Sequence, residues 1–487
     1  MSGPEVITLG CRLNKAESEA MRALADAQDD LIIVNSCAVT NEAVRQTRQA
    51  IRRAKRARPD ARVFVTGCAA QVEPESFAAM PEVDRVLGNT EKLEASSYQP
   101  FVSSEVETPF RAKPRSESLD FARRGPSTSL GANGFLVPAQ AEIRVSDIME
   151  VRETAPHLVS GFAERSRAFV EVQNGCDHRC TFCIIPYGRG NSRSVPAGLV
   201  VERIKALVGE GFREVVLTGV DVTSYGPDLP GGPTLGQLIE RILRHVPDLP
   251  RLRLSSLDCI EMDDRLFDIA TGEPRFMPHL HMSFQAGDDL ILKRMKRRHS
   301  RSDAVETVAR LKEKRPEIAI GADLIAGFPT ESDEMAGNTL RLVDECDIVM
   351  GHIFPFSPKR GTPAARMPQV PPAIAKERAR RLREACARRR AAWLEGLVGT
   401  TQRVLMENDG KGHAENFAPV RVRHSRESGN PASFTGEKLD PIEQDRHVPR
   451  TWLRSAGHCA PVQFRGGDVL AVQVTGLENG TLIGVPA

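Results

Sequence analysis

Short apolar runs alternate with longer amphipathic stretches over the first hundred residues of the chain. The runs predict buried strands, and apolar residues at helical spacing between them predict helices. Strands are predicted at VITL (6–9), LIIVNS (31–36) and RVFVTG (62–67), and helices at 14–25 and 41–58, with Asn41 capping the second helix. Strands that alternate with helices predict an open parallel α/β sheet as an amino-terminal domain.

The same alternation returns near residue 166 and continues through six strand–helix units. Strands are predicted at 168–173, 214–219, 251–256, 280–285, 318–327 and 347–354, with helices such as 197–210 and 302–314 between them. Six consecutive β/α units predict a parallel barrel, either open or closed.

Short strands with glycine-rich joints follow a strongly basic helix predicted at 374–396. They are predicted at 403–408, 418–423, 467–476 and 481–485, a pattern typical of a small all-β barrel. Two polar stretches interrupt these patterns, and we expect a partly disordered linker or insertion at 101–165 and an inserted loop at 424–461. The predicted domains are therefore 1–100, 166–395 and 396–487, with the linker 101–165 between the first two.

Composition narrows the classes of function. The 487 residues include 66 basic and 64 acidic ones, so a net charge of +2 excludes a uniformly basic nucleic-acid coat but allows a local basic face. No apolar run reaches the roughly 18–20 residues of a membrane span, and the start MSGPEVITLGC lacks a secretory pattern. We therefore expect a cytoplasmic protein, in which ten cysteines indicate metal binding or catalysis rather than disulfides.

Three cysteines with a CxxxCxxC spacing follow the first strand of the six-unit series. Cys176, Cys180 and Cys183 place three thiolates on one loop, and soft thiolates suit zinc or an iron–sulfur cluster. Structural zinc needs four ligands, and His178 is the one further candidate nearby. Three ligands to a four-iron cluster would instead leave one iron open for a substrate or cofactor.

The CxxxCxxC loop, with Phe182 before its last cysteine, resembles the radical S-adenosylmethionine (SAM) family, whose open iron chelates the methionine end of SAM. The alternative is a zinc knuckle or a set of structural thiols. A barrel of six β/α units is the architecture that this family uses, and its site residues gather at the carboxyl ends of the strands. The resemblance implies SAM contacts at Phe182, Thr218, Gly219, Ser283, Gln285 and the 321–327 stretch with Asp323.

Three more cysteines each follow a predicted strand of the amino-terminal domain. Cys11 follows 6–9, Cys37 follows 31–36 and Cys68 follows 62–67. Parallel strands present their carboxyl ends along one edge of the sheet, so these cysteines should meet in space. Three buried free thiols are the alternative, because cysteine is often buried. The shared placement favours a second three-thiolate cluster.

Several segments resemble the methylthiotransferases, which attach a methylthio group at an unactivated carbon. They are TLGCRLNKAES, VNSCAVTNEA, TGCAAQ, CTFCIIPYGRGNSRSV, LTGVDVTSYG, SFQAGDDLILKRMKRRHS, GFPTES and FPFSPKRGTPAARM. The resemblance covers about 1–95, 166–420 and 461–487. The start TLGCRLNKAES is most like the branch that acts on N6-threonylcarbamoyladenosine-37 of tRNA. Isopentenyladenosine-37 and a ribosomal-protein aspartate remain alternative substrates, and a non-enzymatic zinc-containing RNA-binding protein is an alternative of another class.

The family resemblance also implies cofactors and partners. One [4Fe-4S] cluster on Cys11, Cys37 and Cys68 would carry the sulfur, and a second on Cys176, Cys180 and Cys183 would cleave SAM to the radical that attacks C2 of adenine. A low-potential electron donor such as flavodoxin or ferredoxin, a sulfur donor and the tRNA anticodon loop are the implied partners. No membrane is expected.

Basic residues cluster locally in three places, although the total charge is nearly neutral. They lie at 45–58, 293–298 and 376–390, and the terminal strands resemble the RNA-binding TRAM barrel of this family. Any one basic group is most simply a solvated helix face, but the three groups and the barrel together favour RNA. The remaining cysteines lack a special placement and are expected to be structural or incidental: Cys259, Cys346, Cys386 and Cys459.

Overall fold

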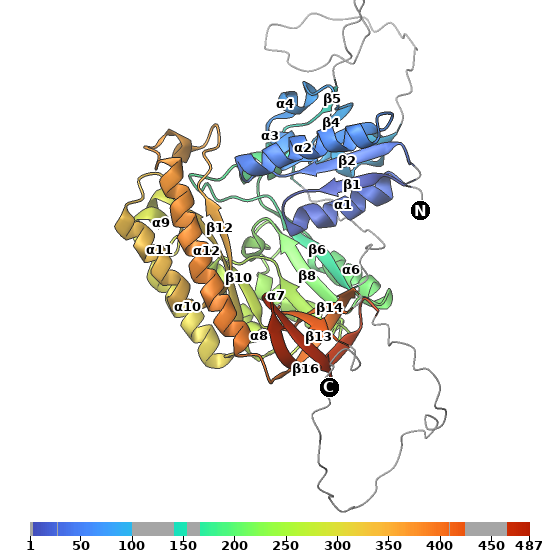
Figure 1. The fold of residues 1–487 in the computed structure, drawn as a ribbon. Coiled ribbons are helices and arrows are strands. Elements are labelled where there is room, and N and C mark those ends of the chain that lie inside the picture. The colour runs from blue at the N-terminus through green and yellow to red at the C-terminus, as the bar shows by residue number, and fades with distance from the viewer. Residues whose placement is uncertain (1–2, 27, 100–140, 153–165, 409, 424–464) are drawn as a thin grey trace, which may run out of the picture.

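The computed structural model describes residues 3–26, 28–99, 141–152, 166–408, 410–423 and 465–487. They form an amino-terminal α/β domain, a central β/α domain and a small carboxy-terminal barrel, as predicted (Figure 1). The predicted loop 424–461 and Cys459 lie outside the described residues. Among the helices that are described, none combines the length and apolar character needed to cross a membrane.

The amino-terminal domain is a five-stranded parallel sheet with the strand order β1-β2-β3-β4-β5. Its elements are β1 (Glu5–Thr8), α1 (Arg12–Leu24), β2 (Leu31–Ser36), α2 (Asn41–Ala57), β3 (Arg62–Gly67), α3 (Cys68–Val72), α4 (Pro74–Ala78), β4 (Arg85–Leu87) and β5 (Glu142–Arg144). Every residue of β2 is buried: Ile32 and Val34 face one apolar cluster, and Leu31 and Ile33 face another. Burial on both faces explains why this strand reads as a continuous apolar run.

Two details of this domain differ from the sequence-based expectation. Residues 142–144, which fall in the predicted linker, pair with β4 as the fifth strand, and Arg85 Nε lies 2.6 Å from Glu142 Oε2. This strand has three residues and one apolar side chain, too little for a periodic signal. Thr40, not Asn41, caps α2: its hydroxyl accepts a hydrogen bond from Ala43 N at 3.0 Å.

The central domain contains six parallel strands, which confirms the predicted partial barrel. Its elements are β6 (Arg167–Asn174), α5 (Ile185–Arg189), β7 (Arg193–Ser194), α6 (Ala197–Gly209), β8 (Glu214–Gly219), α7 (Leu235–His245), β9 (Arg251–Leu254), α8 (Asp264–Gly272), β10 (His279–Gln285), α9 (Asp289–Met295), α10 (Arg301–Lys314), β11 (Ala319–Ala326), α11 (Asp333–Glu345), β12 (Ile348–Pro355) and α12 (Pro372–Glu395). The strands form the sheets β7-β6-β8-β9 and β10-β11-β12, joined through the bridge between Leu257 and Met282. The short strand β7 pairs antiparallel at the edge of β6.

The carboxy-terminal barrel closes on itself in the order β13-β14-β15-β17-β16. Its strands are β13 (Thr401–Asn408), β14 (Lys411–Ala414), β15 (Pro419–Val422), β16 (Val469–Glu478) and β17 (Thr481–Pro486). It packs against the central domain through two buried arginines of β9: Arg251 donates to the carbonyl of Arg403 at 2.8 Å, and Arg253 donates to that of Glu415 at 2.8 Å. The small barrel therefore lies against the central strands, as Figure 1 shows.

Candidate active site

The structure brings the three amino-terminal cysteines together at the carboxyl edge of their sheet. Cys11 follows β1, Cys37 follows β2, and Cys68 is the first residue of α3, directly after β3. Gly10 stands before Cys11 with φ of 100°, and a Cβ there would lie 3.0 Å from the Sγ of Cys37. Position 10 therefore needs glycine, because its backbone approaches Cys37 so closely.

The thiol of Cys37 is protonated at neutral pH while no metal is bound. Burial, together with the neighbouring Cys68 and Cys11, raises its pKa to about 12. A metal must displace the proton, since thiolates are the ligands that metals bind. This electrostatic coupling also shows that the three sulfurs share one small space.

An arginine from the central domain enters this space. Arg189 ends α5, is 2% exposed, and donates from Nε to Sγ of Cys68 at 3.0 Å. Its two terminal nitrogens bond Asn14 and Glu17 of α1. Burial alone would lower its pKa, but Cys68 and Glu17 keep it raised, so the guanidinium stays charged.

The carboxylate of Glu17 is part of a buried ionic network. Lys92 Nζ lies 2.7 Å from Glu17 Oε2, and Arg189 pairs with the other oxygen. Burial opposes ionisation, but Arg189 and Lys92 together hold the pKa of Glu17 down at about 2. Glu171 of β6 is the opposite case, because burial and the charge of Glu17 raise its pKa to about 7. The network thus supplies positive charge beside Cys68.

The second cysteine set lies on the loop between β6 and α5. Backbone and side-chain contacts fix this loop: Thr181 donates from N to the carbonyl of Met295 at 3.1 Å and from Oγ1 to that of Arg294 at 2.8 Å. The Sγ of Cys180 accepts a long hydrogen bond from Arg297 Nη1 at 3.8 Å. Arginine donors therefore reach a sulfur in both cysteine sets.

The two cysteine sets lie next to each other. Burial raises the pKa of Cys183 to about 12, and both Cys180 and Cys68 add to that shift. At Gly188 of α5, a Cβ would lie 3.3 Å from the Cβ of Cys68. Helix α5, which directly follows the second set, thus packs on the cysteine that begins α3. The interface between the two domains is the candidate active site.

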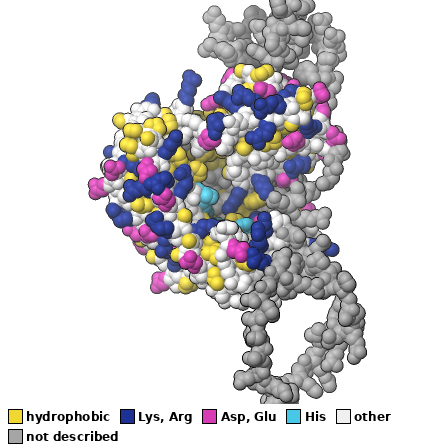
Figure 2. Space-filling view, viewed as in Figure 1, with side chains coloured by type: hydrophobic (Ala, Val, Ile, Leu, Met, Phe, Trp, Pro, Cys, Tyr) yellow, Lys and Arg dark blue, Asp and Glu magenta, His cyan; other side chains and the backbone are white. Residues whose placement is uncertain are grey.

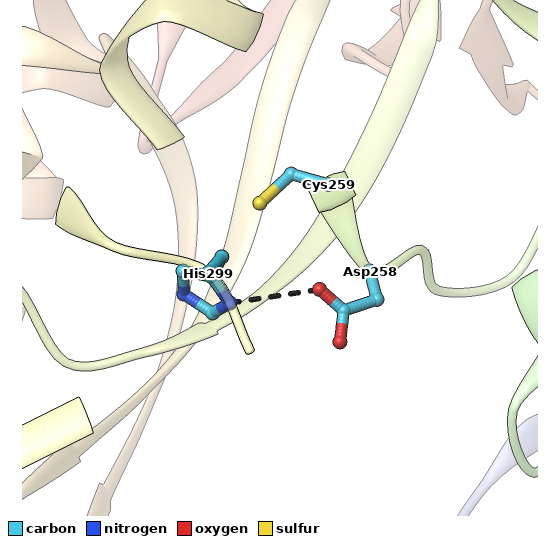
Figure 3. A group of neighbouring side chains, drawn as sticks. All are labelled: Asp258, Cys259 and His299. Carbon is cyan, nitrogen blue, oxygen red and sulfur yellow. Dashed lines mark ion pairs between the residues drawn. The ribbon is translucent and has the colours of Figure 1, made fainter. Parts of the chain in front are cut away.

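The side chains of Asp258, Cys259 and His299 lie together (Figure 3). Asp258 Oδ2 accepts from Arg297 Nη2 at 2.6 Å, and His299 Nδ1 lies 3.5 Å from Oδ1. Burial raises the pKa of Cys259 to about 12, so it is an inert thiol. The group holds Arg297 against Cys180. The sequence offered no signal for it, since His299 lies far along the chain from Asp258 and Cys259 and the three form no motif.

His178, inside the cysteine loop, is engaged by carboxylates. Its Nε2 lies 3.0 Å from Asp221 Oδ2 and 3.4 Å from Glu261 Oε1. These hydrogen bonds raise its pKa to about 10. Two carboxylates therefore already engage the imidazole of His178 within the protein.

Family models match two parts of the chain. One described as the radical SAM superfamily matches residues 170–343, and one described as uncharacterized protein family UPF0004 matches residues 5–88. A relative from Rickettsia prowazekii (strain Madrid E), named threonylcarbamoyladenosine tRNA methylthiotransferase MtaB, is 48% identical over 420 residues, which cover 86% of this chain and 91% of the relative. The chain belongs to the radical SAM methylthiotransferase family.

Two further likenesses were found for this methylthiotransferase. One is a relative from Erythrobacter litoralis (strain HTCC2594), named tRNA-2-methylthio-N(6)-dimethylallyladenosine synthase. It is 31% identical over 422 residues, which cover 83% of this chain and 86% of the relative. Among solved structures, the radical SAM methyltransferase TsrM from Kitasatospora setae has a TM-score of 0.46 and 16% identity, over 72% of this chain and 66% of that chain.

The predicted SAM contacts of the methylthiotransferase fall into two groups. Phe182 packs edge-on against Phe328 with ring centroids 6.4 Å apart, and the carbonyl of Ser283 accepts from the same Arg297 that reaches Cys180, so both lie beside the second cysteine set. Gln285 ends β10 with φ of 65°, a strained value for a residue other than glycine.

The other predicted contacts, Thr218, Gly219 and Asp323, also make contacts within the protein. Thr218 is buried within β8, and a Cβ at Gly219 would lie 2.6 Å from the carbonyl of Gln173. Asp323 accepts hydrogen bonds from His281 Nε2 at 3.0 Å and His352 Nδ1 at 3.2 Å. These histidines carried no sequence motif. Figure 2 shows a hollow between the amino-terminal and central domains with histidine and basic side chains inside it.

The predicted basic groups are partly used inside the protein. The side chain of Arg297 is 9% exposed, and Arg298 pairs with Glu261 of the cysteine-loop network. On α2, Arg45 pairs with Glu42, whereas Arg53 and Arg56 are exposed. Arg297 and Arg298 are therefore part of the site, whereas Lys293 and Lys296 of the same group are exposed.

Proposed function

We propose that this enzyme adds a methylthio group at C2 of N6-threonylcarbamoyladenosine-37 in tRNA. The observation that carries the proposal is that two sets of three cysteines meet at one domain interface, where Cys68 contributes to the raised pKa of Cys183. The relative from R. prowazekii, whose name contains this substrate, supports the choice of nucleoside. The relative from E. litoralis favours dimethylallyladenosine as the second candidate.

The side chains at the interface fit two [4Fe-4S] clusters. Cys11, Cys37 and Cys68 would hold one, in the recess that Gly10 leaves open beside Cys37. Cys176, Cys180 and Cys183 would hold the other, with one iron free for SAM. Three thiolates from each set, with arginine donors on Cys68 and Cys180, match the ligation of such clusters. When bound, the clusters and SAM supply the radical and the sulfur for replacing an unactivated hydrogen.

The protein's own residues hold and orient these groups. Arg189 and Arg297 donate hydrogen bonds to sulfur ligands, which stabilises the negative charge of thiolates. Asp258 fixes Arg297, and Glu17 fixes Arg189. The C2 hydrogen of adenine is not acidic enough for a side-chain base, so general acid–base catalysis would not suffice.

The remaining partners follow from this chemistry. The tRNA anticodon loop would reach the hollow between the domains, with the exposed Arg53 and Arg56 of α2 and the TRAM-like barrel contributing phosphate contacts. A low-potential electron donor such as flavodoxin or ferredoxin, and a sulfur donor, would complete the reaction. The predicted SAM contacts remain proposals: Phe182, Thr218, Gly219, Ser283, Gln285 and Asp323.

The proposal is tested with the anaerobically reconstituted enzyme. Anticodon stem-loops that carry threonylcarbamoyladenosine, isopentenyladenosine or adenosine at position 37 are incubated with SAM and a reductant, and the nucleosides are analysed by mass spectrometry. We expect a methylthio product from the threonylcarbamoyl substrate and none from the Cys180→Ala control. A product from the isopentenyl substrate alone would contradict the proposed substrate, and no product from any stem-loop would contradict the tRNA activity.

A further inference from the structure

Two histidines and an aspartate meet on three neighbouring strands of the central domain, outside the two cysteine sets. His281 lies on β10, Asp323 on β11 and His352 on β12. Asp323 pairs with His352 in the parallel register of β11 and β12, and His281 stands opposite Gly321, two residues before Asp323. Because residues two apart on a strand share a face, the three side chains leave the sheet on the same side.

The ligand atoms of these three side chains converge. Asp323 Oδ1 lies 3.0 Å from His281 Nε2 and 3.2 Å from His352 Nδ1, and all three atoms lie within 4.8 Å of one another. Two ligands of a tetrahedral zinc ion, bound at about 2.0–2.2 Å, lie about 3.3–3.6 Å apart. The two histidine–aspartate distances come within about half an ångström of that spacing, so small side-chain shifts would seat one metal ion.

The fold makes room for the imidazole of His281. A Cβ at Gly321 would lie 2.4 Å from His281 Nδ1, so any larger residue would displace the ring. The φ of Gly321 is not in the left-handed region, and the space that the imidazole needs therefore accounts for the glycine better than the backbone does. The His281 side chain is 6% exposed, whereas that of His352 is 61% exposed. The group thus has a fixed buried side and a side open to solvent.

The donor set and its charge suit a divalent transition metal. Two imidazoles and one carboxylate are typical ligands of zinc and of iron(II), and three protein ligands leave a coordination position open. The negative charge of Asp323, shared by two neutral imidazoles, favours a cation. Arg12 interacts electrostatically with Asp323, but its side chain donates a hydrogen bond to the carbonyl of Leu254 instead.

We infer that His281, Asp323 and His352 form a binding site for one divalent transition-metal ion, separate from the two iron–sulfur clusters. The inference does not depend on which nucleoside the enzyme modifies. Both histidines contact Oδ1 of Asp323, and a metal bound through that oxygen leaves Oδ2 for the proposed contact with SAM. The open coordination position would take water or an oxygen of a bound substrate.

Zinc binding to the anaerobically reconstituted holoenzyme tests the site, because the clusters then occupy the cysteines. Equilibrium dialysis against micromolar Zn²⁺, followed by elemental analysis, gives the zinc bound per chain. We expect the parent to bind one zinc ion, and Asp323→Asn and the exposed His352→Gln each to weaken binding by about tenfold or more. His245→Gln, at an exposed histidine that ends α7, is the matched control and should bind zinc as the parent does.

X-ray absorption at the zinc edge identifies the ligands of the bound ion. Nitrogen and oxygen ligands that are lost in His352→Gln would support the site, whereas sulfur ligands would place the zinc on the cysteines and overturn the inference. No zinc on the parent, or equal binding by the parent, Asp323→Asn and His352→Gln, would also overturn it. The three side chains would then link their strands by hydrogen bonds alone. Iron content equal to that of the parent shows that a variant keeps its clusters.

Discussion

Replacement of Arg189 by glutamine is expected to lower the free energy of unfolding of the amino-terminal domain by about 3 kcal/mol. The change removes the guanidinium that pairs with buried Glu17 and leaves Lys92 as its remaining cation. Without Arg189, the pKa of Glu17 should return from about 2 toward 4.5 or above. That shift corresponds to about 3 kcal/mol at about 1.4 kcal/mol per unit. The loss of one member of a buried ion pair typically costs about 3–5 kcal/mol, which agrees.

Amide hydrogen exchange followed by mass spectrometry measures this loss directly. Peptides from α1 and β2 of the metal-free Arg189→Gln variant at pH 7 should exchange about a hundredfold faster than those of the parent. Arg22→Gln removes a partly buried pair with Glu19, in which the Arg22 side chain is 39% exposed, and should change exchange by less. Because the pKa of Glu17 is depressed, its stabilisation is complete above pH 4.5 and is lost as the pH falls toward 2.

A double-variant cycle decides whether the ion pair causes the effect. Once Glu17 is replaced by glutamine, Arg189→Gln should cost far less, because no buried carboxylate is left unpaired. Equal costs in both backgrounds would refute the reasoning, as would unchanged exchange in α1 of the single variant.

Three further results are expected. Cys180→Ala should abolish formation of 5′-deoxyadenosine from SAM, whereas Cys37→Ala should still form 5′-deoxyadenosine but yield no methylthio nucleoside. If a folded Cys37→Ala protein with an intact cluster on Cys176, Cys180 and Cys183 forms no 5′-deoxyadenosine, the separate roles of the two cysteine sets are contradicted. Glu171→Gln should melt at a higher temperature than the parent at pH 8 but not at pH 4.5. Because the pKa of Glu171 is raised, its ionisation lowers the stability of the folded parent as the pH rises from 4.5 to about 7. A difference in melting temperature that does not depend on pH would contradict this assignment. Gly10→Ala should lower iron bound per chain to about that of Cys37→Ala, since its Cβ would lie 3.0 Å from Cys37 Sγ; full iron content would show that the recess tolerates the methyl group.

The sequence predicts the larger elements well, because continuous burial leaves apolar runs such as that of β2. Strands β4, β5 and β7 were not predicted, since two or three residues show no period. Strand β14 was also not predicted, because its four residues KGHA include one buried alanine and no β-branched side chain.

The cysteines and their supporting residues differ in how they can be predicted. Strand-end position places Cys11, Cys37 and Cys68 at one edge, because parallel strands share their direction. Arg189 lacks such a rule: its partners lie in another domain, and only the packed fold brings them together. Asp258 and His299 could not be predicted for the same reason, because only the packed fold brings them together.

The most direct test of the account is nucleoside mass spectrometry of total tRNA from a strain that lacks this chain, compared with its parent. The account predicts the selective loss of 2-methylthio-N6-threonylcarbamoyladenosine and accumulation of the nucleoside without the methylthio group. Restoration by the parent chain, but not by Cys37→Ala or Cys180→Ala, would tie the loss to the two cysteine sets. Loss of isopentenyl-type methylthio nucleosides instead, or no change in any tRNA nucleoside, would contradict the account.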